Sequence, residues 1–363
     1  MADKNIAEST VMDALRTVME PELHQDLVTL NMVRNVQIND GTVDVTVMLT
    51  TPACPLKNVM QEDIQKAMSH IEGIDKVNVH FDSNVKKDSR IGEKLKIDVK
   101  NIIAIASGKG GVGKTTVAVN LALALNKTGA KVGILDADIY GPNIPQMLGV
   151  HHLPQPVGNK IVPAKSYNLQ VMSIGFLVKE DEPIIWRGPL LHKAIQDFFN
   201  DVLWDDLDYL IVDLPPGTGD VQISLAQTIP LTGGIIVSTP QDVALADAKR
   251  GLVAFQKFDV PVIGIIENMA YFIAPDTGNR YEIFGSGGAE RAAEQFRVPF
   301  LGRLPLDPQA REGGDLGKPV VVEHPDSEIA HSFHDVAGEI AARVAVMNFE
   351  GIKKIQVSAD AAK

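Results

Sequence analysis

The segment Gly108–Thr115 has the residue types and spacing of a phosphate-binding loop. It reads Gly-Lys-Gly-Gly-Val-Gly-Lys-Thr and fits the pattern G-x-x-x-x-G-K-S/T. Its glycines allow successive backbone N–H groups to surround a phosphate, and Lys114 supplies a positive charge for the β- and γ-phosphate oxygens. We therefore expect ATP to bind through Gly108, Lys109, Gly110, Gly111, Val112, Gly113, Lys114, Thr115 and Thr116.

Two aspartates that end apolar runs are candidates for the rest of an ATP-hydrolysing site. Asp213 ends the run Leu-Ile-Val-Asp, and we expect it to hold Mg²⁺ through a water molecule, while the Thr115 hydroxyl binds the metal directly. Asp138 ends the sequence Asp-Ala-Asp, where a carboxylate near the γ-phosphate can orient the attacking water. Either aspartate alone also fits a helix cap. Together with Lys114 they favour a Mg²⁺-dependent ATPase.

The elements that position these residues are predicted by apolar runs. A strand at 102–106 precedes the loop and a helix at 116–125 follows, so the helix N-terminus adds its partial positive charge at the phosphates. Continuous apolar runs are typical of parallel strands that are covered on both faces. Further runs of this kind lie at 132–136, 209–213, 234–239 and 262–266. Their alternation with helical segments predicts an α/β domain with a doubly wound, mostly parallel sheet.

A smaller unit precedes this domain. A helical pattern runs from Val11 to Met19, and alternating strands at 33–38 and 42–49 flank Asn-Asp-Gly, which is a strong hairpin signal. A helix at 56–68 and a strand at 77–81 follow. The predicted organisation is a small α+β domain at 1–82, a linker at 83–100, the P-loop ATPase domain at 101–350 and a frayed tail at 351–363.

Composition excludes several classes of protein. The chain has 363 residues, and its formal net charge of -12 gives no overall attraction to nucleic acid or anionic lipid. A single cysteine, Cys54, excludes an intramolecular disulfide and a zinc site with several thiolates from one chain. No apolar run reaches the roughly 18 residues of a membrane helix, and the N-terminus lacks the pattern of a secretory signal. We expect a cytoplasmic protein whose partners include neither nucleic acid nor membrane.

The segment Asp213–Asp220 closely resembles the switch segment of the Mrp/ApbC family of iron-sulfur cluster carrier ATPases, within the MinD/ParA-like superclass. Gly217 and Gly219 in it would hinge a loop that senses the γ-phosphate. The N-terminal unit is similar to the small iron-sulfur assembly domain that often precedes this ATPase, at residues 20–22 and 50–55. The resemblance implies a homodimer that delivers clusters to apo iron-sulfur client proteins and works with scaffold proteins. It extends over 138–145, 186–189, 207–209, 239–244, 267–269, 283–285 and 311–315.

The resemblance also assigns roles to single residues. Lys109 resembles the signature lysine that reaches across a nucleotide-sandwich dimer, which adds it to the other catalytic candidates, Lys114 and Asp138. Asn268 resembles the adenine-reading asparagine of the superclass. Pro305 and Asp307 belong to a segment that resembles the loop over the base.

The chain departs from the family pattern where many members carry C-x-x-C after the Asn-Met segment. Ala274 and Thr277 occupy those positions, and neither side chain replaces a thiolate ligand of iron. The resemblance implies a 4Fe–4S cluster, for which Cys54 is the one thiolate that the chain offers. A helix that begins beside Cys54 would lower the pKa of the thiol if its N-terminus pointed at the sulfur. A cysteine also fits a small buried apolar side chain.

Three functions remain open. The leading one is an ATP-driven iron-sulfur cluster carrier. A positioning or partition ATPase would need a basic amphipathic C-terminal helix or a basic face, whereas residues 349–363 contain three lysines and few apolar anchors. An ATPase adaptor that docks client proteins but holds no cluster is the third, because the C-x-x-C pair is missing.

Overall fold

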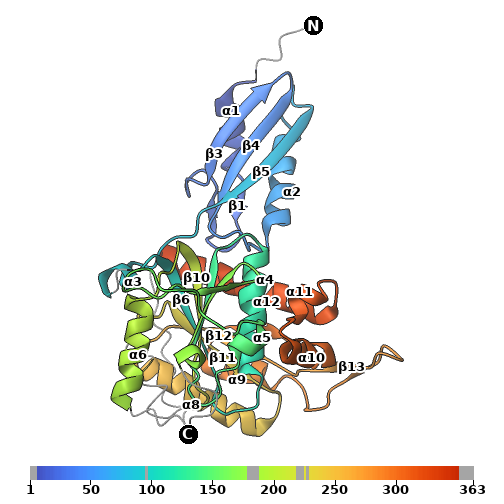
Figure 1. Ribbon diagram of the computed structural model, residues 1–363. Coiled ribbons are helices and arrows are strands. Elements are labelled where there is room, and N and C mark those ends of the chain that lie inside the picture. The colour runs from blue at the N-terminus through green and yellow to red at the C-terminus, as the bar shows by residue number, and fades with distance from the viewer. Residues whose placement is uncertain (1–5, 95–96, 178–187, 218–224, 226–228, 351–363) are drawn as a thin grey trace.

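The computed structural model describes residues 6–94, 97–177, 188–217, 225 and 229–350. Figure 1 shows two lobes, which we call the N-terminal domain, residues 6–83, and the large domain, residues 99–350. The predicted fold class, a small α+β domain before a doubly wound, mostly parallel α/β domain, is confirmed. The expected hinge at Gly219, the stretch at 186–187 and the tail at 351–363 lie outside the described residues. No described helix is both long and apolar enough to cross a membrane.

A three-stranded sheet and two helices form the N-terminal domain. Strands β3 (Val33–Asn39) and β4 (Thr42–Leu49) make an antiparallel hairpin, and β5 (Lys76–Ser83) pairs with β4 in parallel. Alternate side chains of β4 are buried, as the period of a half-covered strand requires. They pack against α1 (Glu8–Leu15) and α2 (Lys57–Met68), and the buried strand residues are Val43, Val45, Val47 and Leu49.

The first helix differs from its sequence-based prediction. It begins at Glu8 and ends at Leu15, whereas Met19 belongs to the short strand β1 (Met19–Glu20), which pairs with β2 (Gln25–Asp26). The Glu20 carboxylate accepts hydrogen bonds from the next turn's backbone N–H groups, at residues 22 and 23. This side-chain bonding competes with a helix and turns the chain instead.

The segment predicted as a linker is partly ordered against the large domain. It contains α3 (Ser89–Lys94), and strand β6 begins at Val99, inside the predicted linker. Val85 and Ile91 are buried in the core of the large domain. Lysine is the commonest residue of this segment, but its buried apolar residues Val85 and Ile91 fix its position.

The large domain contains an eight-stranded sheet in the order β15-β12-β11-β6-β10-β7-β9-β8. Every pairing between described strands of this sheet is parallel except that of β8 with β9. The strands are β6 (Val99–Ala106), β7 (Val132–Asp136), β8 (Ala164–Ser166), β9 (Leu169–Ser173), β10 (Leu207–Asp213), β11 (Gly233–Ser238), β12 (Val262–Glu267) and β15 (Phe300–Arg303). A separate hairpin, β13 (Phe272–Ile273) and β14 (Arg280–Tyr281), projects from the domain at the right of Figure 1.

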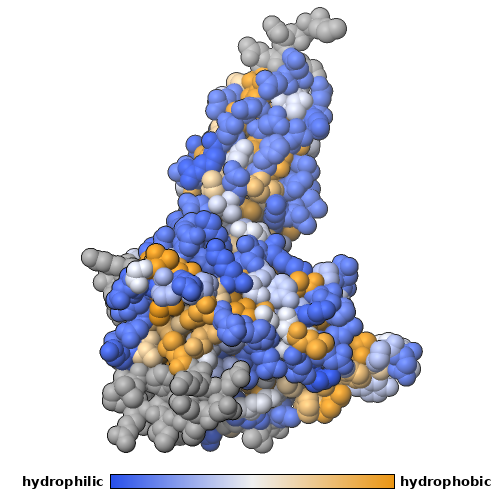
Figure 2. Space-filling view, viewed as in Figure 1, coloured by the Kyte–Doolittle hydropathy of each residue, from blue (hydrophilic) through white to orange (hydrophobic). Residues whose placement is uncertain are grey.

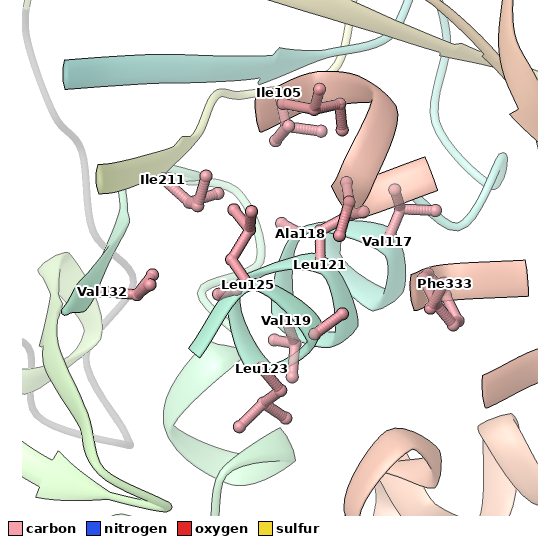
Figure 3. Packing of buried hydrophobic residues seen from close by; sticks show 14 of the residues in the cluster. Ile105, Val117, Ala118, Val119, Leu121, Leu123, Leu125, Val132, Ile211 and Phe333 are labelled. Carbon is pink, nitrogen blue, oxygen red and sulfur yellow. The ribbon is translucent and has the colours of Figure 1, made fainter. Parts of the chain in front are cut away.

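Helices cover both faces of this sheet. One core contains α4 (Lys114–Lys127) and α12 (Glu328–Glu350), and the other contains α6 (Gly188–Asn200), α8 (Asp242–Lys257) and α9 (Gly288–Phe296). Figure 3 shows side chains of α4 packed among residues of three strands and of α12 in the first core. The remaining helical elements are α5 (Ile144–Met147), η1 (Ile174–Leu177), α10 (Pro308–Leu316) and α11 (Val320–Glu323).

Candidate functional site

The predicted phosphate-binding loop connects the end of β6 to the start of α4. Gly111 and Gly113 have φ values of 80° and 77°, a region that residues with a Cβ rarely adopt. A Cβ at Gly113 would also clash with the Asn268 amide nitrogen. At Gly110 and Gly111 a Cβ would meet no atom within 4 Å, so this side of the loop faces open space. The loop therefore leaves its backbone accessible beside the N-terminus of a 14-residue helix.

Lys114 and two predicted carboxylates meet at the mouth of this loop. The Lys114 Nζ atom lies 2.7 Å from Asp213 Oδ1 and 3.4 Å from Asp138 Oδ2. The Thr115 hydroxyl donates a hydrogen bond of 2.7 Å to Asp213 Oδ2. The Asp213 side chain is fully buried, and burial raises its pKa, against the lowering effect of Lys114. The structure thus brings together four of the predicted site residues from the ends of two strands, β7 and β10, and the start of helix α4.

A third carboxylate, Asp136, lies directly behind this group. Its Oδ2 atom accepts hydrogen bonds from the Ser173 hydroxyl at 3.0 Å and the Ile144 N–H at 3.2 Å, and its Oδ1 atom accepts one from the Asp138 N–H at 3.2 Å. Burial, with the charge of Asp213, raises the pKa of Asp136 to about 8. Sequence reasoning gave Asp136 no role, although it is the first aspartate of Asp-Ala-Asp. It fixes the backbone that presents Asp138.

A cavity of about 430 Å³ opens beside the loop. Thr115, Thr116, Asn268, Pro305 and Asp307 all line it, which places the residues expected for the phosphates and for the base around one space. The volume is in the range of ordinary ligand pockets.

Asn268 forms one side of this cavity. Its amide nitrogen donates a hydrogen bond of 2.8 Å to the Val112 carbonyl, so it is joined to the phosphate-binding loop itself. The cavity has further lining residues that sequence reasoning did not assign: Asn143, Gln146, Met147, Arg311, Ile329 and Phe333. Asn143 precedes α5, and the others come from α5, α10 and α12. No local spacing in the sequence indicates that these helices lie around one cavity.

Lys109 lies apart from this ion-paired group. Its side chain is half-buried, and its carbonyl accepts a hydrogen bond of 2.9 Å from the Ser107 hydroxyl. No ion pair among the described residues includes Lys109. Gly217, in the expected switch loop, donates its N–H to the Ser107 carbonyl at 3.0 Å and has a φ of 96°. The loop and the described start of the switch segment are therefore joined at Ser107.

Cys54 lies in the N-terminal domain, outside the residues that line the cavity. It is half-buried against that domain's core, and burial raises the pKa of its thiol to about 11, with smaller raising effects from Glu22 and Glu20. The expected lowering of its pKa by a helix N-terminus is therefore wrong, because burial outweighs the hydrogen bond from the Leu56 backbone. Within the described residues, no group of three or more histidine, cysteine, aspartate or glutamate side chains is arranged to hold a metal ion.

Ala274 and Thr277 lie in the exposed turn between β13 and β14. The Ala274 N–H donates to the Asn279 carbonyl at 2.9 Å, and the Gly278 N–H donates to the Ala274 carbonyl at 2.8 Å. The turn is closed by its own backbone. Its side chains provide no thiolate at the positions where many family members carry cysteine.

Comparisons with known proteins identify the family of both domains. Residues 98–341 match the family model described as NUBPL iron-transfer P-loop NTPase, and residues 8–81 match the model described as iron-sulfur cluster assembly protein. The iron-sulfur cluster carrier protein of Synechocystis sp. is 49% identical over 348 residues, which cover 94% of this chain and 99% of that protein. The protein of the same name from Escherichia coli K12 is 43% identical over 337 residues, covering 92% and 91%.

Two solved structures have similar folds. A nucleotide-binding protein from Archaeoglobus fulgidus, solved in complex with ADP, is 36% identical with a TM-score of 0.58 and covers 68% of this chain and 97% of its own. The cell division ATPase MinD of Pyrococcus furiosus is 26% identical with a TM-score of 0.51, covering 66% and 98%. A glycine loop between a parallel strand and a helix, with lysine and aspartates at its mouth, defines a P-loop NTPase. The chain belongs to the family of iron-transfer P-loop NTPases.

Proposed function

We propose that this protein binds and hydrolyses ATP and carries iron-sulfur clusters to apoproteins. The observation that carries the ATPase part is the meeting of Lys114, Asp138 and Asp213 beside the open side of the glycine loop, next to a cavity of nucleotide size. Membership of the iron-transfer family supports the proposal that the cargo is an iron-sulfur cluster. The cytoplasm is the proposed location.

The residues divide the chemistry of phosphoryl transfer among them. The backbone N–H groups of the glycine loop and the N-terminus of α4 bind the phosphates, and Lys114 leaves the carboxylates to pair with the β- and γ-phosphate oxygens. Asp138 orients the attacking water. Asn268, Pro305 and Asp307 enclose the base, since they line the cavity beyond Thr115 and Thr116.

The donor set beside the loop fits Mg²⁺. The Thr115 hydroxyl and the Asp213 carboxylate are hard oxygen donors whose oxygens lie 2.7 Å apart, and Mg²⁺ prefers such ligands in phosphate sites. When bound, the ion neutralises charge on the phosphate oxygens. Asp213 would hold it through a water molecule and Thr115 directly.

We further propose that the chain acts as a homodimer in which Lys109 reaches the partner's nucleotide. Its side chain is free of described ion pairs, and exposed apolar residues lie on segments near the nucleotide site. Tyr140, two residues after Asp138, and Leu316, at the end of α10, are each 72% exposed. On the face seen in Figure 2, the N-terminal domain is mostly hydrophilic, whereas apolar residues gather on the large domain near α6 and near α10.

Cys54 is the proposed thiolate ligand of the cargo, shared between two subunits or with an external thiol. Its raised pKa means that iron must displace a tightly held proton. The test is anaerobic reconstitution with iron and sulfide, followed by visible absorption spectra and transfer to an apo-ferredoxin. Wild type should take up and transfer a cluster, and Cys54→Ser should do neither. Ser69→Ala, at an exposed position of the same domain, is the matched control.

A second candidate function, an ATPase adaptor that docks clients and holds no cluster, is favoured by one observation. The turn at Ala274 and Thr277 lacks the usual thiolates. If wild type takes up no cluster, or if Cys54→Ser transfers it equally well, Cys54 is not the ligand and the adaptor function replaces the carrier function.

A further inference from the structure

The loop that contains Cys54 is one of the parts of the N-terminal domain that meet the large domain. Thr51 and Tyr209 share a buried hydrogen bond of 3.0 Å between their hydroxyl groups, although 158 positions separate them in the sequence. Ala53 is 7% exposed and belongs to the apolar core that contains α4 and α12. Cys54 therefore lies immediately beside a residue that is inserted into the large domain.

The loop that contains Cys54 packs against Gly338, in the middle of α12. A Cβ at Gly338 would lie 3.3 Å from the Ala53 carbonyl oxygen and 3.4 Å from the Pro55 Cβ, so only a glycine allows the present approach without a shift. Glycine in the middle of a helix costs about 1 kcal/mol relative to alanine. The two residues that flank Cys54 are thus both held against a single position of α12.

The same helix forms a wall of the nucleotide cavity. Ile329 and Phe333 line the cavity, and Phe333 lies five positions before Gly338, a rise of about 7.5 Å along the helix. Figure 3 shows Phe333 beside Val117 of α4, the helix that begins at the phosphate-binding loop. One helix therefore contacts the nucleotide cavity and the Cys54 loop within two turns.

The far end of α12 is also anchored. Asn348 donates hydrogen bonds to the Asn101 side chain at 2.7 Å and to the Lys86 carbonyl at 3.2 Å. The Lys86 ammonium lies 4.4 Å from the centre of the Phe349 ring. A shift of α12 would change its contacts with Lys86, on the segment that connects the two domains, and with Asn101 of β6. Packed helices shift as units rather than bend locally.

We propose that α12 couples occupancy of the nucleotide cavity to docking of the Cys54 loop, so that nucleotide controls access to the thiol. This inference rests on the proposed nucleotide site, and it adds that the bound nucleotide regulates the exposure of the Cys54 thiol. A ligand that enters the cavity contacts Ile329 and Phe333 and displaces α12. The displacement of α12 changes the contacts of Gly338 with the two neighbours of Cys54.

The experiment uses the single cysteine as its own probe. The rate of Cys54 alkylation by a maleimide is measured by mass spectrometry on the full chain at one pH, without nucleotide, with ADP and with a non-hydrolysable ATP analogue. We expect the rates with and without nucleotide to differ by about fivefold or more, the lower end of typical coupling between two sites. Nucleotide binding is measured by calorimetry on the same samples.

Variants of the contact locate the coupling. Gly338→Leu keeps a good helix former in α12 but fills the space of Ala53 and Pro55, so alkylation should become fast in every nucleotide state. Because coupling between sites is reciprocal, this variant should also change the dissociation constant of the nucleotide. Thr51→Val, which without added bulk removes the hydrogen bond to Tyr209 and the one from the Ala53 N–H, should give a smaller change in the same direction. His331→Leu, at an exposed position of α12, is the matched control and should behave as wild type.

Equal alkylation rates in wild type with and without bound nucleotide would overturn the proposal, as would an undiminished nucleotide effect in Gly338→Leu. Absence of nucleotide binding would overturn both this coupling and the proposed ATPase. Alkylation requires neither iron nor hydrolysis, so a protein that carries no cluster but shows the nucleotide effect contradicts the carrier function alone.

Discussion

Lys114 Nζ lies 2.7 Å from Asp213 Oδ1, and the side chains are 5% and 0% exposed. The lysine expected to bind phosphate is therefore paired with the carboxylate expected to serve the metal. Removal of one partner from a buried pair leaves an uncompensated charge. If Lys114 binds phosphate as proposed, we expect nucleotide binding to exchange this carboxylate partner for phosphate oxygens.

Lys114→Ala should weaken ATP binding at least about tenfold, because a charged hydrogen bond to phosphate contributes roughly 1.5 to 3 kcal/mol. Titration calorimetry measures the affinity, and Lys165→Ala, at an exposed position, is the control. The midpoint temperature of thermal unfolding should also fall in Lys114→Ala, since Asp213 loses its ion-pair partner. Unchanged ATP affinity in a folded variant would remove the phosphate assignment.

Asp138→Ala should keep ATP affinity within a few-fold and lose turnover, since positioning of water acts on the transition state. Steady-state phosphate release and calorimetry separate the two effects. Asp326→Ala changes an exposed aspartate and should alter neither. Equal losses of affinity and of turnover would contradict a role limited to the attacking water.

Lys109 should act on the nucleotide of the partner subunit. Lys109→Ala and Asp138→Ala should each be inactive alone, and a mixed dimer has one site with both defects and one with neither. Partial ATPase activity should therefore return on mixing, because a catalytic cation supplied in trans contributes on the order of 10³ in rate. No recovery, with subunit exchange demonstrated by differently labelled chains, would place Lys109 in cis or outside catalysis.

The stability of the chain should fall as the pH rises through 7 because of Glu22. Burial, with the charges of Glu20 and Glu339, raises the pKa of Glu22 from 4.5 to about 7, against the lowering effect of Arg343; Cys54 also interacts with this carboxyl. The folded chain then binds this proton more tightly than the unfolded chain, so the contribution is complete below about 4.5 and lost as the pH passes 7.

Urea unfolding across this pH range measures the effect. Glu22→Gln should flatten the profile between about pH 5 and pH 8, whereas Glu62→Gln, at an exposed position of α2, should leave it unchanged. Parallel profiles for wild type and Glu22→Gln would show that the pKa of Glu22 is not raised by its position between the N-terminal domain and α12.

The central strands and the glycine loop could be predicted because each depends on local sequence. Val132 to Asp136 is a strand in the structure as in the prediction, since a run buried on both faces needs no other signal. Strand β9 was not predicted, because Leu169–Ser173 is short and mixes polar with apolar residues.

The walls of the cavity depend on tertiary structure and were harder to predict. Arg311 and Phe333 reach it from helices that carry ordinary amphipathic patterns, which indicate burial but not the neighbour. For Cys54 the sequence left two alternatives open, a thiol activated by a helix N-terminus and a small buried apolar side chain, because the choice depends on how the folded N-terminal domain surrounds the thiol.

Strand β10 carries Tyr209 near one end and Asp213 at the other, with the hydrogen bond to Thr51 and the ion pair with Lys114 respectively. Their separation is an even number of residues, so both side chains belong to the same face of the sheet. Insertion or deletion of one residue between them would turn one of the two side chains to the opposite face. Evolution can therefore change the length of the loops around β10, but the spacing within it ties the site of domain contact to the site of phosphate chemistry.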